Sequence, residues 1–147
     1  MRRPHLLVVE DNPDDEVLTL RALQKTGLNL KIDIARDGAE AVDYLLAEGA
    51  HAERAVEPPP QMVLLDLKLI KLSGLEVLKR VRAHPRTAIV PVVILTTSTE
   101  EQDVLACYSN GCNSYIPKPI NFDEFARQID HLANYWLRIN RLPLSLA

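Results

Sequence analysis

The sequence predicts an α/β protein in which a five-stranded parallel sheet is covered by helices on both faces. The first observation is a series of short, uninterrupted apolar runs, such as Leu6–Val9 and Met62–Leu65. Such runs are typical of strands that are buried on both faces. The second observation is that stretches with helical apolar periodicity separate these runs. This alternation of strand and helix favours a parallel sheet.

The first half of the chain contains two predicted strands and two predicted helices. Asn12-Pro13 is a typical helix start, because asparagine caps free N–H groups and proline suits the first helical position. The acidic run Asp14–Glu16 fits the same helix N-terminus, where negative charge is favoured. The predicted elements are strand Leu6–Val9, a helix from Pro13 to a stop at Gly27, strand Leu30–Ala35 near a sheet edge, a turn at Asp37-Gly38 and helix Ala39–Glu48.

The second half begins with a predicted loop, Gly49–Pro60, because Pro58-Pro59-Pro60 does not fit inside a helix or a sheet. We expect one domain, residues 1–140, followed by a tail, residues 141–147. The predicted elements after the loop are strands Met62–Leu65, Val92–Leu95 and Ser114–Ile116, and helices Gly74–Ala83, Glu100–Asn110 and a long last helix, Asn121–Asn140.

The composition excludes several classes of protein. The chain has 147 residues, of which 47% are hydrophobic and 25% charged, and its formal net charge of -3 disfavours a nucleic-acid binder, which would usually show a basic face. No stretch reaches the roughly 20 apolar residues of a membrane span, and the apolar run near the N-terminus is too short for a signal peptide. Cys107 and Cys112 lack the spacing of a zinc site. We therefore expect two reduced thiols in a cytoplasmic protein.

Polar side chains stand where four of the predicted strands end. They are Glu10 and Asp11 after the first strand, Asp66 after the third, Thr96 after the fourth and Lys118 after the fifth. Ligands of an open parallel sheet bind beyond the carboxyl ends of its strands, so we expect these side chains to share one rim. Clustered carboxylates need a cation, and oxygen ligands suit Mg²⁺. A carboxylate is also a nucleophile toward phosphorus, and a lysine and a hydroxyl would stabilise the phosphoryl group.

Each of these residues has an ordinary structural explanation when it is taken alone. The acidic residues could cap turns or the first helix, Thr96 could be structural, and Lys118 could be a surface lysine. Their coincidence at the ends of successive strands is what favours a phosphoryl-acceptor site.

Four stretches make the chain resemble the receiver family of bacterial two-component signalling. They are Leu7–Asn12, Leu64–Leu67, Ile94–Thr96 and Tyr115–Pro119, and the resemblance covers residues 4 to 133 or so. It implies a doubly wound, flavodoxin-like sheet in the order 2-1-3-4-5. It also implies a switch that is controlled by phosphorylation.

The resemblance assigns the metal site and the nucleophile. It implies that Asp66 is the phosphoacceptor. It also implies that Mg²⁺ is bound by Glu10, Asp11, Asp66 and the backbone carbonyl of Lys68. Glu10 replaces the aspartate that is commoner in this family, and its longer side chain would reach the metal through water. Ile70 stands where many receivers have proline, which leaves the stiffness of the loop after Asp66 open.

The resemblance also assigns the switch residues. Thr96 is expected to be the switch hydroxyl and Lys118 the lysine that pairs with the phosphoryl group, with a cis bond between Lys118 and Pro119. Tyr115 has two interpretations of equal weight. It is either the aromatic residue that turns inward on activation or a half-buried strand tyrosine.

The predicted function is that of a single-domain response regulator, not an enzyme, that takes a phosphoryl group from a histidine kinase and signals by protein–protein contact or onward phosphotransfer. The long loop, the Thr96–Ser98 run and the extended last helix resemble regulators that partner phytochrome-type kinases, so a bacteriophytochrome is the expected partner. We expect neither nucleic acid nor membrane as a partner. A scaffold that works without phosphorylation is the main alternative. A phosphatase of the haloacid dehalogenase type would need an aspartate in place of Lys68, and a dinucleotide binder would need a glycine-rich turn.

The C-terminal segment predicts a homodimer. Its apolar residues exceed the single stripe with which a helix packs on a sheet, and exposed apolar patches usually mark an interface. A tail folded back on its own domain, or a kinase-binding surface, is the alternative. The predicted interface residues are Trp136, Leu137, Ile139 and Leu142.

Overall fold

The computed structural model describes residues 3–143 and contains a single parallel sheet in the order β2-β1-β3-β4-β5. The predicted fold class and strand order are confirmed. The strands are β1 (His5–Val9), β2 (Lys31–Ala35), β3 (Met62–Leu65), β4 (Val92–Thr96) and β5 (Ser114–Pro117). The helices are α1 (Pro13–Lys25), α2 (Gly38–Leu46), α3 (Gly74–Ala83), α4 (Glu101–Ser109) and α5 (Phe122–Asn134).

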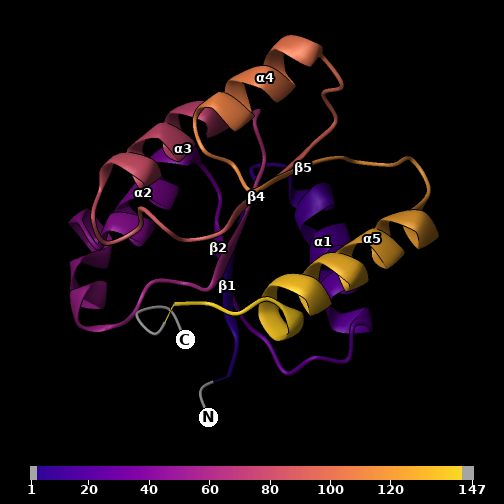
Figure 1. Ribbon diagram of the computed structural model, residues 1–147, viewed down its shortest axis with the longest axis horizontal. Helices are drawn as coiled ribbons and strands as arrows, with labels where there is room; N and C mark the ends of the chain where they lie inside the picture. Colours follow the sequence, from indigo (N-terminus) through magenta and orange to yellow (C-terminus); the bar gives the residue numbers. More distant parts are fainter. Residues whose placement is uncertain (1–2, 144–147) are drawn as a thin grey trace.

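The helices form a layer on each face of the sheet (Figure 1), with α1 and α5 side by side on one face and α2, α3 and α4 on the other. Alternate strand residues point to opposite faces, so the core divides into two clusters. Leu7, Val9 and Ile94 belong to the cluster under α2–α4, and Leu6 and Val8 to the cluster under α1 and α5. Every residue of β1, β3 and β4 is buried, which explains their uninterrupted apolar runs.

Two segments differ from the prediction. The loop after α2 contains 3₁₀ turns, Gly49–Val56, with a kink at His51. The last helix does not continue regularly to Asn140, because α5 ends at Asn134 and a π-helical turn, Tyr135–Ile139, follows it. Apolar periodicity predicted that this stretch is helical, but it does not distinguish α from π winding.

The fold brings the ends of β1, β3, β4 and β5 to one edge of the sheet, as expected for parallel strands. The connections that leave this edge therefore form the candidate site. Within residues 3–143, no helix is both long and apolar enough to cross a membrane.

Candidate functional site

Three carboxylates meet at the edge of the sheet. Glu10, Asp11 and Asp66 each offer an oxygen atom, and these oxygens lie within 4.8 Å of one another. The backbone fixes two of them, because Glu10 N donates to Ala35 O at 3.0 Å and Asp66 N donates to Val9 O at 3.2 Å. The side chain of Glu10 is almost fully buried, whereas those of Asp11 and Asp66 are partly exposed. The predicted acid cluster therefore exists, and it opens to solvent on one side.

The Lys118 ammonium neutralises part of this negative charge. Its Nζ lies 2.8 Å from Glu10 Oε1 and 3.3 Å from Asp66 Oδ2, and the lysine side chain is only 10% exposed. The backbone N–H of Lys118 donates to Thr96 O at 2.6 Å, so the lysine is held at the end of β5 beside β4. The bond between Lys118 and Pro119 is trans, because the described residues contain no cis peptide bond. The expected cis bond is therefore wrong, and the bond has the isomer that X–Pro bonds generally prefer.

Burial and charge shift the protonation equilibria of Glu10 and Lys118. Burial is the largest influence on Glu10, and with the nearby Asp66 it raises the pKa of this carboxyl from 4.5 to about 7, although the Lys118 ammonium acts in the opposite direction. For Lys118, burial lowers the pKa. The hydrogen bond to Glu10 and the charges of Asp66, Glu10 and Asp15 outweigh this effect, so the pKa is raised overall. The ammonium is therefore a permanent cation in this site.

The loop after β3 is fixed by contacts with the start of α2. Gly38 N donates to Ile70 O at 3.1 Å, and a Cβ at Gly38 would lie 2.1 Å from Leu72 O. The Lys71 ammonium lies 3.5 Å from Asp37 Oδ2. These contacts constrain the loop although Ile70 replaces the proline of many receivers.

Lys68 lies in this loop, two residues after Asp66. Its backbone N–H donates to Asp66 Oδ1 at 3.2 Å, and its side chain is exposed. The contact orients the carboxylate of Asp66 and keeps the Lys68 backbone within reach of the acid cluster.

Thr96 is completely buried at the end of β4, next to a network that the sequence did not predict. Its Oγ1 accepts from Ser98 N at 3.2 Å, and Ser98 Oγ donates to Asp103 Oδ2 at 2.6 Å. Tyr115 OH donates to Ser98 O at 3.0 Å, so the half-buried tyrosine ties β5 to the β4–α4 loop. Ser98 therefore connects the predicted switch hydroxyl, the predicted switch aromatic and the first turn of α4.

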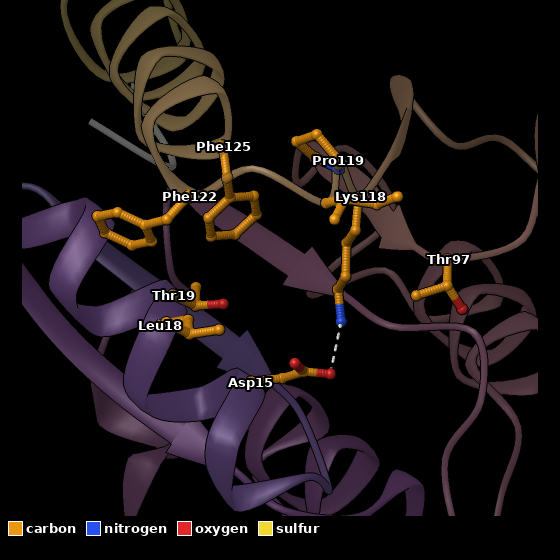
Figure 2. A pocket seen from close by; sticks show the side chains of 9 residues that line it. Asp15, Leu18, Thr19, Thr97, Lys118, Pro119, Phe122 and Phe125 are labelled. Carbon is orange, nitrogen blue, oxygen red and sulfur yellow. Dashed lines mark hydrogen bonds and ion pairs between the residues drawn. The ribbon is translucent and has the colours of Figure 1, made fainter.

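Asp15 is a further residue that sequence reasoning missed. It lies in the first turn of α1, and its Oδ2 is 3.5 Å from Lys118 Nζ. Figure 2 shows this contact at the side of a pocket of about 270 Å³, whose opposite wall includes Phe122 and Phe125. The signal was present, because Asp15 precedes the buried Thr19 by one helical turn and so lies on the same side of the helix. The favourable placement of negative charge at a helix N-terminus explains the whole acidic run equally well, so the run alone does not single out Asp15.

The predicted interface residues have different environments. Trp136 and Leu137 are partly buried and pack against the core cluster of α1 and α5, and Leu142 packs against the opposite cluster. Ile139 is 73% exposed. The described residues beyond α5 thus pack in part on their own domain, which is one of the alternatives to the dimer.

These features agree with the family to which the sequence points. Residues 6–130 match the response regulator receiver domain. Because this match covers most of the chain, the protein belongs to the receiver family of response regulators.

Three known proteins illustrate the relationship. The probable methanogenesis regulatory protein FilR2 of Methanothrix harundinacea is 42% identical over 139 residues, which are 94% of this chain and 86% of FilR2. The structure of the phosphorylated cyanobacterial phytochrome response regulator RcpA is 34% identical, with a TM-score of 0.89 over 97% of this chain and 99% of that one. The Mn²⁺-bound form of response regulator Rcp1, from Synechocystis sp., is 34% identical, with a TM-score of 0.86 over 95% and 99% of the two chains.

Proposed function

We propose that this receiver domain is a phosphorylation-controlled switch in which Asp66 accepts the phosphoryl group of a histidine kinase. One observation carries the proposal: the Asp66 carboxylate lies within an acid cluster and 3.3 Å from a buried lysine ammonium. Oxygen ligands in such a cluster fit a hard divalent cation, and we propose Mg²⁺. The relative Rcp1 has been solved in a Mn²⁺-bound form, which supports binding of a divalent metal.

The chemistry is an in-line transfer of a phosphoryl group. A carboxylate oxygen of Asp66 attacks the phosphorus of the phosphohistidine, the P–N bond breaks, and its electron pair returns to the imidazole nitrogen. The bound cation would supply positive charge to the phosphoryl oxygens. In this proposal Lys118 donates to one of these oxygens, and the Thr96 hydroxyl leaves Ser98 N to bind another. Tyr115 would respond to this movement, because its hydroxyl shares Ser98 with Thr96.

Glu10, Asp11, Asp66 and the Lys68 carbonyl are the proposed protein ligands of the cation. Glu10 also accepts from Lys118 at 2.8 Å, so its second oxygen, or a bridging water, is the atom that we propose for the metal. Phosphorylation leaves the phosphoryl group on the protein itself as an acyl phosphate. We therefore propose a signalling protein and not an enzyme, and we propose that it works in the cytoplasm.

The decisive experiment uses Asp66→Asn, which keeps the shape of the side chain and removes the nucleophile. The parent chain, incubated with a small acyl phosphate and Mg²⁺, should gain the mass of one phosphoryl group, and the variant should gain none. Asp14→Asn is the matched control, because it removes an exposed carboxylate of α1 and should leave labelling unchanged. Persistent label on Asp66→Asn would exclude Asp66 as the sole acceptor. An unlabelled parent would favour the phosphorylation-independent scaffold.

The partner kinase is proposed to be of the phytochrome type, because RcpA is a phytochrome response regulator that matches nearly the whole chain. FilR2 has a higher identity and a different name, so the pairing needs a direct test. Phosphotransfer from a panel of autophosphorylated kinases should be fastest from a phytochrome kinase. Faster transfer from kinases without a light-sensing region would overturn the pairing.

We also propose a homodimer through the segment after α5. Among the described residues of this segment, Ile139 and Tyr135 are the most exposed large apolar ones, at 73% and 47%, and Tyr135 lines a groove beside β5 together with Trp136. Ile139→Asp should convert a dimer into a monomer in light scattering, with the phosphorylation of Asp66 unchanged. Val56→Asp is the control, because Val56 is exposed at 92% and lies in the loop Gly49–Val56, far along the chain from the proposed interface. A parent chain that remains monomeric, phosphorylated or not, would exclude the dimer.

A further inference from the structure

The Lys118 ammonium has a third acidic neighbour that lies outside the carboxylate cluster. Asp15 Oδ2 is 3.5 Å from Lys118 Nζ, whereas the oxygens that lie within 4.8 Å of one another belong to Glu10, Asp11 and Asp66. Figure 2 shows that the lysine side chain extends from the end of β5 toward Asp15 on α1. Asp15 is also more exposed than the other partners, at 39% for its side chain, against 4% for Glu10 and 12% for Asp66.

The backbone of α1 holds Asp15 in this place. Asn12 caps the helix, and its Oδ1 accepts from Asp14 N at 2.9 Å and from Asp15 N at 3.1 Å. Pro13 occupies the first helical position. The carboxylate of Asp15 is therefore presented from a fixed first turn, and not from a mobile loop.

The three partners match the three N–H donors of an ammonium group. Two of these partners, Glu10 and Asp66, are also proposed ligands of the divalent cation. A cation in the acid cluster and the ammonium compete for the same carboxylates, and like charges repel each other at this range. Asp15 is a partner of Lys118 that is not a proposed ligand of the cation.

We propose that Asp15 is a positioning residue, which holds the Lys118 ammonium on the α1 side of the site so that Glu10 and Asp66 can turn toward a divalent cation. The inference rests on the proposed function, because it takes Glu10 and Asp66 as metal ligands. When Asp15 loses its charge, Lys118 has only these two carboxylates as partners, and the cation must compete with a stronger ion pair at each of them.

The test measures the affinity for Mg²⁺ by calorimetric titration of the full chain. Asp15→Asn should weaken binding about fivefold, the scale expected for a partly exposed ion pair. Asp14→Asn is the matched control, because it removes the same charge from the same turn at an exposed position, and it should change the affinity by less than about twofold. Asp15→Glu restores the charge and should recover most of the affinity. Urea unfolding of each variant without metal shows whether the fold is intact.

A second background separates positioning from a general effect of charge. In Lys118→Met, the additional change Asp15→Asn should have little further effect on Mg²⁺ affinity, because the residue through which Asp15 acts is gone. An undiminished effect in that background would overturn the inference and assign Asp15 a direct electrostatic role. Equal affinities of the parent chain and Asp15→Asn would overturn it and leave the proposed metal site standing. A parent chain that does not bind Mg²⁺ would overturn the proposed metal site and this inference with it.

Discussion

Two clusters of ionisable side chains lie at opposite ends of β1, and they differ in how their charges are balanced. The rim site, at the end of the strand, contains Glu10, Asp11, Asp66, Asp15 and Lys118, so four carboxylates share one ammonium. The second cluster, which we call the basal cluster, lies at the start of β1. It consists of His5, the first residue of the strand, and of Asp33, Tyr44 and Arg54.

The groups of the basal cluster find most of their partners in each other. His5 Nε2 lies 2.7 Å from Tyr44 OH and 3.0 Å from Asp33 Oδ2, and Tyr44 OH also donates to Asp33. The Arg54 guanidinium stacks on the Tyr44 ring, with its central carbon 3.6 Å from the ring centroid, and donates to Glu57 at 3.1 Å. Nη2 of Arg54 is buried without a hydrogen bond within the described part of the chain.

This difference separates a structural cluster from a functional one. The basal cluster ties β1, β2, α2 and the 3₁₀ turns together and needs no additional ion, because its one carboxylate has three donors around it. The rim site keeps an excess of negative charge in a largely buried place, which is unfavourable until a cation binds. Changes in the basal cluster should therefore lower stability, and changes in the rim site should mainly alter the response to metal and phosphorylation.

The largest expected effect is that of Arg54→Met. The substitution keeps much of the apolar bulk, but it removes the contact with the Tyr44 ring and leaves the neighbouring carboxylates without their cation. We expect a loss of about 3 kcal/mol in the free energy of unfolding, measured with urea. Arg36→Met is the matched control, because Arg36 is 64% exposed where it pairs with Glu16, and it should change the free energy of unfolding far less than Arg54→Met does. Equal losses in the two variants would contradict the stabilising role of the basal cluster.

The rim site should stabilise the fold only when metal is present. At about 100 times its dissociation constant, a cation that binds only the folded chain adds about 2.7 kcal/mol to the free energy of unfolding. Asp11→Asn should remove most of this gain, whereas Arg54→Met, although less stable, should keep it. The measurement is the melting temperature with Mg²⁺ and with chelator. A parent chain with the same melting temperature in both would contradict the metal site.

The two clusters should have opposite effects on how stability depends on pH. The pKa of Glu10 is raised from 4.5 to about 7, mainly by burial, so the folded chain holds this proton more tightly than the unfolded chain does. Ionisation of Glu10 therefore lowers stability as the pH rises between these values. Burial lowers the pKa of His5 below 6.5, so the folded chain resists this proton, and stability is lost as the pH falls through and below that value.

Unfolding with urea in chelator, across this pH range, separates the two contributions. Glu10→Gln should gain roughly 1–2 kcal/mol over the parent chain above pH 7 and little at pH 4.5. His5→Gln should be destabilised most at high pH and approach the parent chain as the pH falls. If the difference in free energy of unfolding between Glu10→Gln and the parent chain does not vary with pH, the pKa of Glu10 is not raised by folding.

The comparison also shows which parts of the molecule could be predicted from the sequence. Glu10, Asp66 and Lys118 each follow an apolar strand, so their convergence follows from the geometry of parallel sheets. The basal cluster could not be found in this way, because His5, Asp33 and Tyr44 come from the start of a strand, the middle of an edge strand and a helix. Their proximity depends on how α2 packs on the sheet, which periodicity does not specify.

The same reason explains the other omissions. Arg54 lies in a segment that its prolines and polar residues identified only as a loop, yet its side chain is buried. Ser98 Oγ reaches Asp103 from the short connection between β4 and α4, and no spacing rule predicts that contact. Sequence pattern thus locates residues whose place follows from regular elements, and it misses those whose place follows from loop geometry.

The smallest expected effect is that of Tyr115→Phe near the rim site, which we compare with Tyr44→Phe in the basal cluster. Tyr44 OH bridges two buried or half-buried groups, so Tyr44→Phe leaves both His5 and Asp33 short of a partner and should cost about 1–3 kcal/mol. Tyr115 OH donates to the backbone carbonyl of Ser98 at 3.0 Å, in a half-buried place that water can reach. Tyr115→Phe should therefore cost about 0.5 kcal/mol.

The order of the two variants should be reversed when the response to phosphorylation is measured in place of stability. Tyr44→Phe should be phosphorylated on Asp66 and change conformation as the parent chain does, because its hydroxyl has no contact with the rim site. Tyr115→Phe should be phosphorylated normally, but the β4–α4 loop should respond less, because the link between Tyr115 and Ser98 is lost. Amide exchange of α4 with and without phosphorylation measures this response. If Tyr115→Phe leaves the exchange difference unchanged, Tyr115 is an ordinary half-buried strand residue, and the link through Ser98 has no role in the switch.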